Sequence, residues 1–403
     1  MDLSLSNSLV SSATLNPDKL SLDLQFATDK TLTACKGPTP TFTRASTATF
    51  VGSDGLIQSA AINAARFDHD PITLACKGLL IEESRTNLLA RSAEIENAYW
   101  TNSGVTTAGN DQISPDGNLN ADTITAGASS IPSIYRAVSC VASTAYTLSF
   151  YIKIGTLTLN EFKFAVRDDT NGVFIDQNII PNVTPVTTEW RRVVYTFTTP
   201  VGCVLVRPYL SRFSSTTEGT FSIWGAQLEQ GSFPTSYIPT TTASVVRSAD
   251  VCSITGSDFT GMYNQSEGSF ACNYSIPAGF TGNRYATAIE DTAGGLINAY
   301  TFRNTNSGIN FINTGGYLSI IGAITTGLSK HIIAYSGVSE FVYCKDGTIG
   351  SNTGSGTRDP SVFIRMSIGT LEAANSFSLN GHIASIRYFK KRLSNAKLQT
   401  LTT

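Results

Sequence analysis

The chain has 403 residues, 41% of them hydrophobic, which is enough for roughly two to four globular domains. Only 14% of the residues are charged, so Ser, Thr, Asn and Gln must form much of the polar surface, and these residues favour turns and exposed strand faces over long helices. A net charge of −2 without a long basic run argues against nucleic-acid binding, and no apolar stretch reaches the ~18 residues that a membrane-inserted helix requires.

The N-terminus does not have the pattern of a secretory signal. Residues 1–10 contain neither a positively charged stretch nor an apolar stretch that could serve as a signal peptide. The uncharged, Ser- and Thr-rich composition is nevertheless typical of an extracellular protein. We therefore expect a protein that is made in the cytoplasm and released when the cell lyses.

Cysteine usage argues against both a zinc site and a disulfide framework. The seven cysteines are odd in number and widely spaced, and they form neither a CxxC motif nor a cluster with histidine. We expect most of them to be buried thiols that pack as small hydrophobic side chains. One or two pairs remain an alternative, and Cys35 and Cys76 are the first to test because they share the contexts TACKG and LACKG.

Strand-like alternation recurs along the chain and predicts an all-β protein. The period of two is clearest in a set of segments bounded by Gly, Pro, Asn, Asp or Ser, namely residues 146–154, 161–166, 190–197, 204–210 and 220–228. In the turn at residues 168–172, Asn171 and Gly172 are expected to supply the positive φ angles of a hairpin. One short helix is predicted at residues 395–399, with Ser394 as its N-cap.

The domain organisation follows from these patterns. Residues 1–90 are predicted to form an N-terminal arm and a small β unit that anchors the protein. Residues 91–248 and 249–403 are predicted to form two antiparallel β-sandwich domains, joined by a Thr- and Ser-rich linker at residues 240–244.

Several phrases in the N-terminal part resemble one known group of proteins. Residues 42–49 (FTRASTAT), 65–68 (ARFD) and 78–88 (GLLIEESRTNL) resemble the N-terminal module of tail and fibre-associated proteins of tailed bacteriophages. Residues 223–229 (IWGAQLE) and 233–240 (FPTSYIPT) are similar to the closing strand and exit loop of a carbohydrate-binding-module-like jelly roll in the same proteins. Proline in the exit loop cannot donate a ladder hydrogen bond, so the chain must leave the sheet there.

The C-terminal segment resembles a second fold. Residues 380–396 are similar to the last strands of a concanavalin-like, laminin-G-like sandwich. Together the resemblances imply an outward-facing structural protein on the virion exterior, in a tail fibre, a head fibre or a decoration. They imply other virion proteins and a host-surface glycan as partners, and a homo-oligomer, with a trimer favoured because phage fibres are commonly trimeric.

Candidate sugar-binding residues are the aromatic side chains outside the expected strands. The rings of Tyr99 and Trp100 are candidates for stacking on a sugar, with an aromatic plug at the domain edge as the alternative; Tyr135 and Arg136 are candidates for lining a concave face. Trp190 and Trp224 lie inside predicted strands and are expected in the core.

A structural calcium ion is the one cofactor that the sequence suggests. Asp111, Asp116 and Asp122 cluster in one predicted loop region, and Ca²⁺ prefers such oxygen ligands, although no loop matches an EF-hand. His69 between two aspartates is expected to bond within a turn rather than to bind a metal.

No catalytic constellation stands out, and we expect no enzyme. The three histidines are far apart, which gives little support to a Ser-His-Asp site. Three adjacent acidic pairs, Glu82-Glu83, Asp168-Asp169 and Glu290-Asp291, should diverge in strands or be solvated in turns rather than flank a glycosidic bond. The alternatives to a glycan-binding virion protein are a decoration protein without a receptor and, third, a glycan depolymerase.

Overall fold

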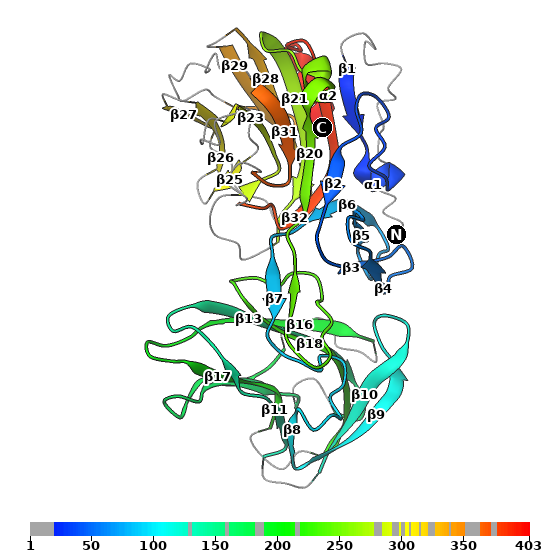
Figure 1. Cartoon of the computed structure of the whole chain (residues 1–403), viewed down its shortest axis with the longest axis vertical. Coiled ribbons are helices and arrows are strands. Elements are labelled where there is room, and N and C mark those ends of the chain that lie inside the picture. Colours follow the sequence, from blue (N-terminus) through cyan, green and yellow to red (C-terminus); the bar gives the residue numbers. More distant parts are fainter. Residues whose placement is uncertain are drawn as a thin grey trace. The chain divides into compact units, whose positions relative to one another are not determined.

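The computed structural model consists almost entirely of antiparallel strands (Figure 1), which confirms the predicted all-β class. It describes residues 20–127, 131–157, 161–181, 189–213, 218–277, 284–291, 298–299, 303–305, 308–313, 316–320, 327–337, 340–350, 363–371 and 377–403. No helix in these ranges is long and apolar enough to cross a membrane.

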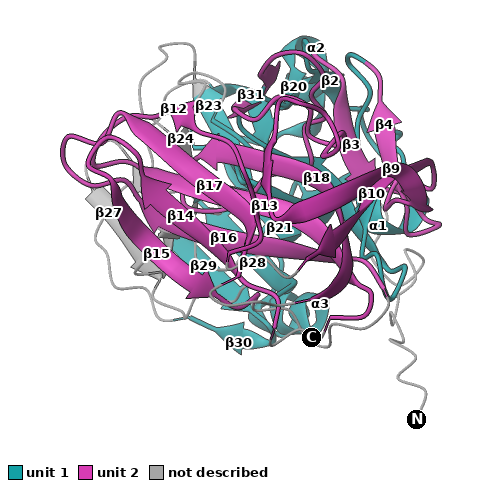
Figure 2. Ribbon diagram, turned by 90° about the horizontal axis from the view of Figure 1, so that it is seen from below, with its two compact units in different colours: residues 1–45, 62–83, 249–403 teal, residues 46–61, 84–248 magenta. Residues whose placement is uncertain are grey.

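The chain divides into two compact units, coloured separately in Figure 2. Unit 1 comprises Met1–Ala45, Ile62–Glu83 and Ala249–Thr403, and unit 2 comprises Ser46–Ala61 and Ser84–Ser248. The boundary before residue 249 coincides with the predicted one. The segment 1–90, predicted as a unit of its own, instead contributes to both units because its strands pair with strands from later in the chain.

Unit 1 contains two larger sheets that face each other across a core, and one small sheet. The eight-stranded sheet has the order β30 (Thr348–Ile349), β29 (Glu340–Lys345), β28 (Ser329–Ser336), β21 (Glu267–Ser275), β32 (Gly381–Phe389), β6 (Cys76–Ile81), β5 (Phe67–His69), with β1 (Leu20–Leu24) paired to β32. The five-stranded sheet has the order β2 (Thr41–Thr43), β20 (Val251–Thr255), β31 (Phe363–Ile368), β23 (Thr287–Asp291), β24 (Asn298–Ala299). The small sheet comprises β22 (Arg284–Tyr285), β25 (Arg303–Thr305), β26 (Gly308–Asn313) and β27 (Gly316–Ile320).

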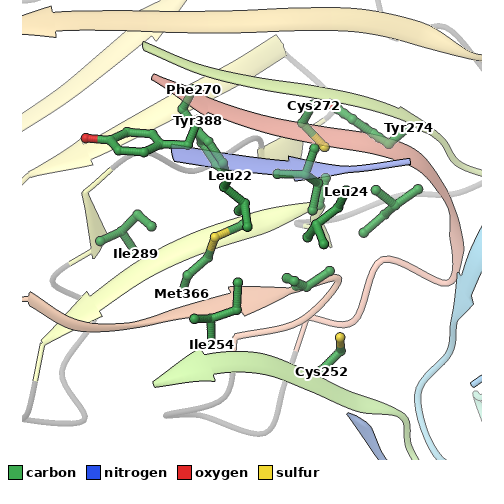
Figure 3. Close-up of a cluster of buried hydrophobic side chains, with 14 of the residues drawn as sticks. Leu22, Leu24, Cys252, Ile254, Phe270, Cys272, Tyr274, Ile289, Met366 and Tyr388 are labelled. Atoms are coloured by element: carbon green, nitrogen blue, oxygen red, sulfur yellow. The ribbon is translucent and has the colours of Figure 1, made fainter. Parts of the chain in front are cut away.

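The core of unit 1 follows from the period of two in its strands. In β21, Phe270, Cys272 and Tyr274 alternate toward the inside, and they meet Ile254 and Met366 from the other sheet (Figure 3). Leucines from β1 enter the same cluster, so the first described strand is part of the same sandwich as the last strand, β32.

Three helices complete unit 1 in the described ranges: α1 (Phe26–Asp29), α2 (Gly256–Met262) and α3 (Asn395–Thr402). The predicted C-terminal helix is confirmed as α3, and the Ser394 hydroxyl accepts a hydrogen bond from the Lys397 amide. Leu398 is buried on the inner side of this helix.

Unit 2 is a second sandwich. Its five-stranded sheet has the order β16 (Arg191–Thr198), β13 (Ala145–Ile154), β18 (Gly219–Gln230), β10 (Leu119–Ala126), β9 (Val105–Ile113). Its six-stranded sheet has the order β15 (Val173–Ile179), β14 (Phe164–Asp168), β17 (Leu205–Arg212), β11 (Ser133–Tyr135), β8 (Thr101–Ser103), with β12 (Val138–Ser139) paired to β17. Two separate strand pairs are added: the hairpin of β3 (Ala48–Val51) with β4 (Ile57–Ala60), and the long-range pair of β7 (Arg85–Asn87) with β19 (Val245–Arg247).

Two local predictions for unit 2 need correction. Gly172 has a positive φ of 73°, as predicted, but Asn171 does not have a positive φ. The Asn171 backbone amide instead donates to the Asp168 carboxylate, so only one of the two residues supplies a positive φ angle to the turn. The stretch predicted as a linker begins on the body of unit 2: Thr240 is only 5% exposed, and its hydroxyl donates to the Leu89 carbonyl. Its amide also donates to the Ser92 hydroxyl, which holds the segment against the sandwich.

Candidate functional site

One face of the six-stranded sheet of unit 2 carries an unusual set of side chains. Along β17, Val206 and Leu210 are buried in the core, so the alternate residues Arg207 and Tyr209 point away from it. The neighbouring strands β14, β15 and β11 contribute Arg167, Phe174 and Tyr135 to the same face, and Arg212 and Asp169 complete it. We call these seven residues the arginine–aromatic face: Tyr135, Arg167, Asp169, Phe174, Arg207, Tyr209 and Arg212.

The aromatic rings of this face are in contact with one another and with the arginines. The Tyr209 ring centroid lies 4.8 Å from that of Tyr135 and 6.0 Å from that of Phe174. The Arg207 guanidinium carbon lies 4.7 Å from the Tyr135 ring centroid, and that of Arg212 lies 4.4 Å from the Phe174 centroid. Such cation–π contacts fix the orientation of the guanidinium planes.

A single carboxylate organises two of the arginines. Asp169 pairs with Arg167 at 3.1 Å and with Arg207 at 2.6 Å, and its side chain is only 5% exposed. The arginines remain 29% and 25% exposed, so their outer donors face solvent. The adjacent Asp168 does not join them: it is buried, and hydrogen bonds from Asn171 are the main cause that lowers the pKa of its carboxyl.

Of the residues predicted to contact sugar, Tyr135 belongs to this face. Tyr99 and Arg136 lie at the ends of β8 and β11: the Arg136 guanidinium carbon is 4.3 Å from the Tyr99 ring centroid, and its Nη1 donates to the Tyr99 carbonyl. Trp100 is only 3% exposed, and its Nε1 donates to the Arg91 carbonyl. Its ring is part of the core, so the prediction that Trp100 stacks on a sugar is wrong.

The three aspartates predicted to hold calcium do not converge. Asp111 accepts the Thr123 amide, and the Asp116 carboxylate accepts hydrogen bonds from the Ser114 hydroxyl and the Asn118 amide in the turn that follows β9. Asp122 accepts the amides of Ile95 and Asn110. Within the described part of the chain, no three His, Cys, Asp or Glu side chains are placed to hold a metal ion. The carboxylates satisfy backbone donors around an irregular strand pair instead, because β9 and β10 shift register there.

Asp122 has a partner that the sequence did not indicate, Glu96. Burial, followed by a hydrogen bond with Glu96, raises the pKa of the Asp122 carboxyl to about 7. The two side chains are neighbours, and the Glu96 amide also donates to the Asp122 carboxylate, at 3.1 Å. They are also too close to flank a glycosidic bond, which requires a separation of roughly 5 Å or more.

The first set of phrases that carry the phage resemblance forms a buried ion network in unit 1. Arg44 and Arg66 both donate to Asp250, at 3.1 and 2.5 Å, and Arg66 also pairs with Glu82 at 2.8 Å. The Glu82 amide donates to the same Asp250 carboxylate. The network joins three separate chain segments of unit 1, and these phrases therefore have a structural role.

The second set of phrases, residues 223–229 and 233–240, forms the closing strand of unit 2 and its exit loop, and side-chain hydrogen bonds hold both in place. The Asn87 side chain donates to the carbonyls of Ala226 and Ile238 and accepts the Leu228 amide. The buried Glu229 carboxylate accepts hydrogen bonds from the amide and the hydroxyl of Thr235. Here again, the residues that carry the resemblance hold the fold together.

The acidic pairs Glu82-Glu83 and Asp168-Asp169 diverge as predicted, whereas the side chain of Asp291, in the third pair, lies outside the described residues. Glu82 pairs with Arg66, whereas Glu83 pairs with Arg284 at 3.0 Å and accepts the Asn380 amide group. A hollow of about 560 Å³ between α2 and β31 in unit 1 is lined mostly by small or aliphatic groups, with Arg365 as its one charged lining residue. We find no grouping there that resembles a catalytic site.

Comparisons with known proteins give only partial overlaps. No known family and no curated protein matches the sequence. Tailspike protein 4 of bacteriophage CBA120 overlaps with a TM-score of 0.28 and 19% identity, over 36% of this chain and 21% of that one. Trypanosoma rangeli sialidase overlaps with a TM-score of 0.32 and 11% identity, over 38% and 25%. The tandem CBM22 domain of Paenibacillus barcinonensis Xyn10C overlaps with a TM-score of 0.29 and 11% identity, over 77% and 99%.

These overlaps are limited in extent. The chain spans about a fifth to a quarter of the length of the tailspike and sialidase structures that it matches. Overlaps with TM-scores of this size do not establish a shared function. The functional interpretation therefore depends on the side chains of the arginine–aromatic face.

Proposed function

We propose that unit 2 is a glycan-binding module and that the arginine–aromatic face is its binding surface. The observation that carries the proposal is the convergence of three rings and three arginines on the solvent side of one sheet, with Asp169 orienting two of the arginines. Sugar hydroxyls need planar, fixed donors, and guanidinium groups held on rings provide them with little loss of side-chain entropy.

We further propose that the chain is an outward-facing structural protein on the exterior of a phage virion, in a tail or head fibre or a decoration. This part of the proposal rests on the resemblance of residues 42–49, 78–88 and 223–240 to phage tail proteins. Contacts with other virion proteins and a homotrimeric state belong to the same proposal, because several copies compensate for weak single sites through avidity.

The proposal assigns binding without catalysis. Asp169 forms ion pairs with two arginines, and the preceding residue, Asp168, is buried. The arginine–aromatic face therefore offers no pair of free carboxyls. Glycoside hydrolysis requires one carboxyl that donates a proton and a second that acts as nucleophile or base. A reducing-end assay on bound polysaccharide should therefore show no release at any pH.

The proposal is tested by glycan binding of the full chain and two variants. Arg212→Gln removes an arginine of the face, whereas Arg192→Gln removes one that stacks on Tyr151 of the other sheet. Both variants lose one positive charge, so a difference in their binding must come from the position of the arginine and not from the net charge. We expect Arg212→Gln to weaken binding on a glycan array by about tenfold or more, which is about 1.4 kcal/mol, while Arg192→Gln binds like the wild type. Equal binding by all three proteins, or no glycan bound by any, contradicts the proposal.

A further inference from the structure

The arginines of the arginine–aromatic face cover the rings that a sugar would otherwise use. A sugar stacks its C–H face on an open aromatic ring, but Arg207 lies over Tyr135 and Arg212 lies over Phe174, at 4.7 and 4.4 Å from the ring centroids. Arg212 also approaches the Tyr209 ring, at 6.0 Å, and Tyr209 itself is buried. What the face presents to a ligand is therefore guanidinium groups supported by rings.

The charges of this face do not cancel. Arg167 and Arg207 share the one carboxylate of Asp169, and no carboxylate among the described residues forms an ion pair with Arg212. Three guanidinium groups and one carboxylate leave an excess of two positive charges. Asp176 on β15 forms no ion pair with Arg212; its carboxylate points toward the other sheet, where it accepts a hydrogen bond from the Tyr195 hydroxyl of β16.

Guanidinium groups in this arrangement suit an anionic group better than a hydroxyl. A guanidinium is planar, always charged and weakly hydrated, and its paired N–H donors match the two oxygens of a carboxylate. Stacking on a ring removes much of the side-chain freedom that would otherwise be lost on binding. Arg207 and Arg212 lie at separate points along β17. This arrangement also suits a repeating polymer, whose units bring anionic groups at intervals.

We infer that the ligand of this face is an acidic polysaccharide, whose carboxylate-bearing sugars are held by Arg207 and Arg212. The inference rests on the proposed glycan-binding function and specifies its ligand class. A nucleic acid is a poor fit, because the chain carries a net charge of −2 and no long basic run to follow a phosphate backbone.

The test compares matched acidic and neutral polymers with the full chain. Polygalacturonate and polysialic acid are each paired with their carboxyl-reduced derivatives, dextran sulfate is paired with dextran, and single-stranded poly-dT serves as a polyanion without acidic sugars. We expect at least tenfold tighter binding to one or both carboxylated polymers than to the reduced forms, and binding that weakens as salt rises. Tightest binding to dextran sulfate or poly-dT overturns the assignment of carboxylated sugars.

Two variants separate failure of the inference from failure of the proposed function. Arg212→Gln should abolish the preference for the acidic polymer while Arg192→Gln keeps it, because only the first charge lies on the face. Equal binding of acidic and neutral polymers, with Arg212→Gln still weaker than Arg192→Gln, overturns the acidic ligand and leaves glycan binding intact. No binding of any polysaccharide overturns both. Circular dichroism of each variant checks that unit 2 is folded.

Discussion

Arg44 and Asp250 form a buried ion pair, with 3.1 Å between Nη1 and the carboxylate, although 206 positions separate them in the chain. Asp250 also binds Arg66, which pairs with Glu82 as well, so two carboxylates compensate two guanidinium groups inside unit 1. A buried charge without its partner lowers the stability of the fold strongly, whereas a complete network of buried charges changes the free energy of folding little. The pair therefore fixes which chain segments come together rather than adding much stability of its own.

Replacing Asp250 by Asn should destabilise unit 1 by about 3–5 kcal/mol, because it removes the buried carboxylate that pairs with both Arg44 and Arg66. Hydrogen exchange of peptides from β6 and β20 measures the loss locally. Asp258→Asn is the matched control, since Asp258 is exposed in the first turn of α2 and its loss should cost less than about 1 kcal/mol. Equal protection of these peptides in both variants would show that the network is not required.

The sequence predicts the strands better than it predicts which strands meet. Residues 204–210 were expected as a strand from alternation alone, and that alternation already places Arg207 and Tyr209 on one face. That Tyr135 and Phe174 flank them depends on the order β15-β14-β17-β11, which local pattern does not contain. For the same reason, the local pattern does not show that Arg44 and Arg66 meet at Asp250, because this contact depends on the pairing of β2 with β20.

Burial explains the other differences between the predicted and the observed positions of side chains. Trp100 and Tyr99 are neighbours in a polar stretch, yet a hydrogen bond from the Trp100 ring to Arg91 turns that ring into the core. Glu96 and Asp122 are 26 residues apart, and nothing in either local sequence indicates that they meet. Pairings of this kind become visible only when the register of β9 and β10 is known.

Asp122 should make unit 2 more stable in mild acid than at neutral pH. Its pKa is raised to about 7 when folded, from 3.8 when exposed, so the folded state holds a proton that the unfolded state releases. The resulting stability is present below about pH 4 and is lost as the pH rises to about 7, by at most about 1.4 kcal/mol per unit. Urea unfolding followed by tryptophan fluorescence reports on unit 2, because Trp100, Trp190 and Trp224 all lie in it.

Asp122→Asn is the variant that isolates this effect. It should flatten the pH dependence of unit 2 between pH 4 and 7, since Asn does not titrate and its amide oxygen can still accept one backbone donor. Asp116→Asn, in the neighbouring turn, is the control and should keep the wild-type slope. A wild-type slope in Asp122→Asn would mean that other groups cause the pH dependence.

His331 should give unit 1 the opposite pH dependence. Burial is the main cause that lowers its pKa to about 3, from 6.5, and its Nδ1 lies 2.8 Å from the Tyr343 hydroxyl. The folded state therefore keeps this ring neutral, and its contribution to stability is present above pH 6.5 and lost as the pH falls toward 3. Opening of β28, measured by hydrogen exchange corrected for its intrinsic pH dependence, should rise on acidification in the wild type and rise less in His331→Gln, with His382→Gln as the control. An equal rise in His331→Gln would assign the acid sensitivity to other groups.

Cys140 and Cys203 are the cysteines that we expect an oxidant to join. Their Sγ atoms are 3.6 Å apart, whereas Cys35 donates to the Asp29 carboxylate; all seven cysteines are free thiols in the structure. Burial and the contact with Cys140 raise the pKa of the Cys203 thiol to about 12, so the reaction should be slow at pH 7 and faster at pH 9. The bond would close a loop between residues 63 positions apart and stabilise unit 2 by about 4 kcal/mol.

Peptide mapping by mass spectrometry after diamide treatment identifies which thiols are joined. Cys203→Ser should abolish the linked peptide, whereas Cys35→Ser should leave it unchanged, because Cys35 belongs to unit 1. The tryptophan-fluorescence transition should shift to higher urea only in the oxidised proteins that keep both Cys140 and Cys203. A peptide map dominated by a Cys35–Cys76 link would instead support the pairing that the repeated ACKG context suggests. It would also show that the distance between thiols in the folded state does not decide which cysteines form a disulfide.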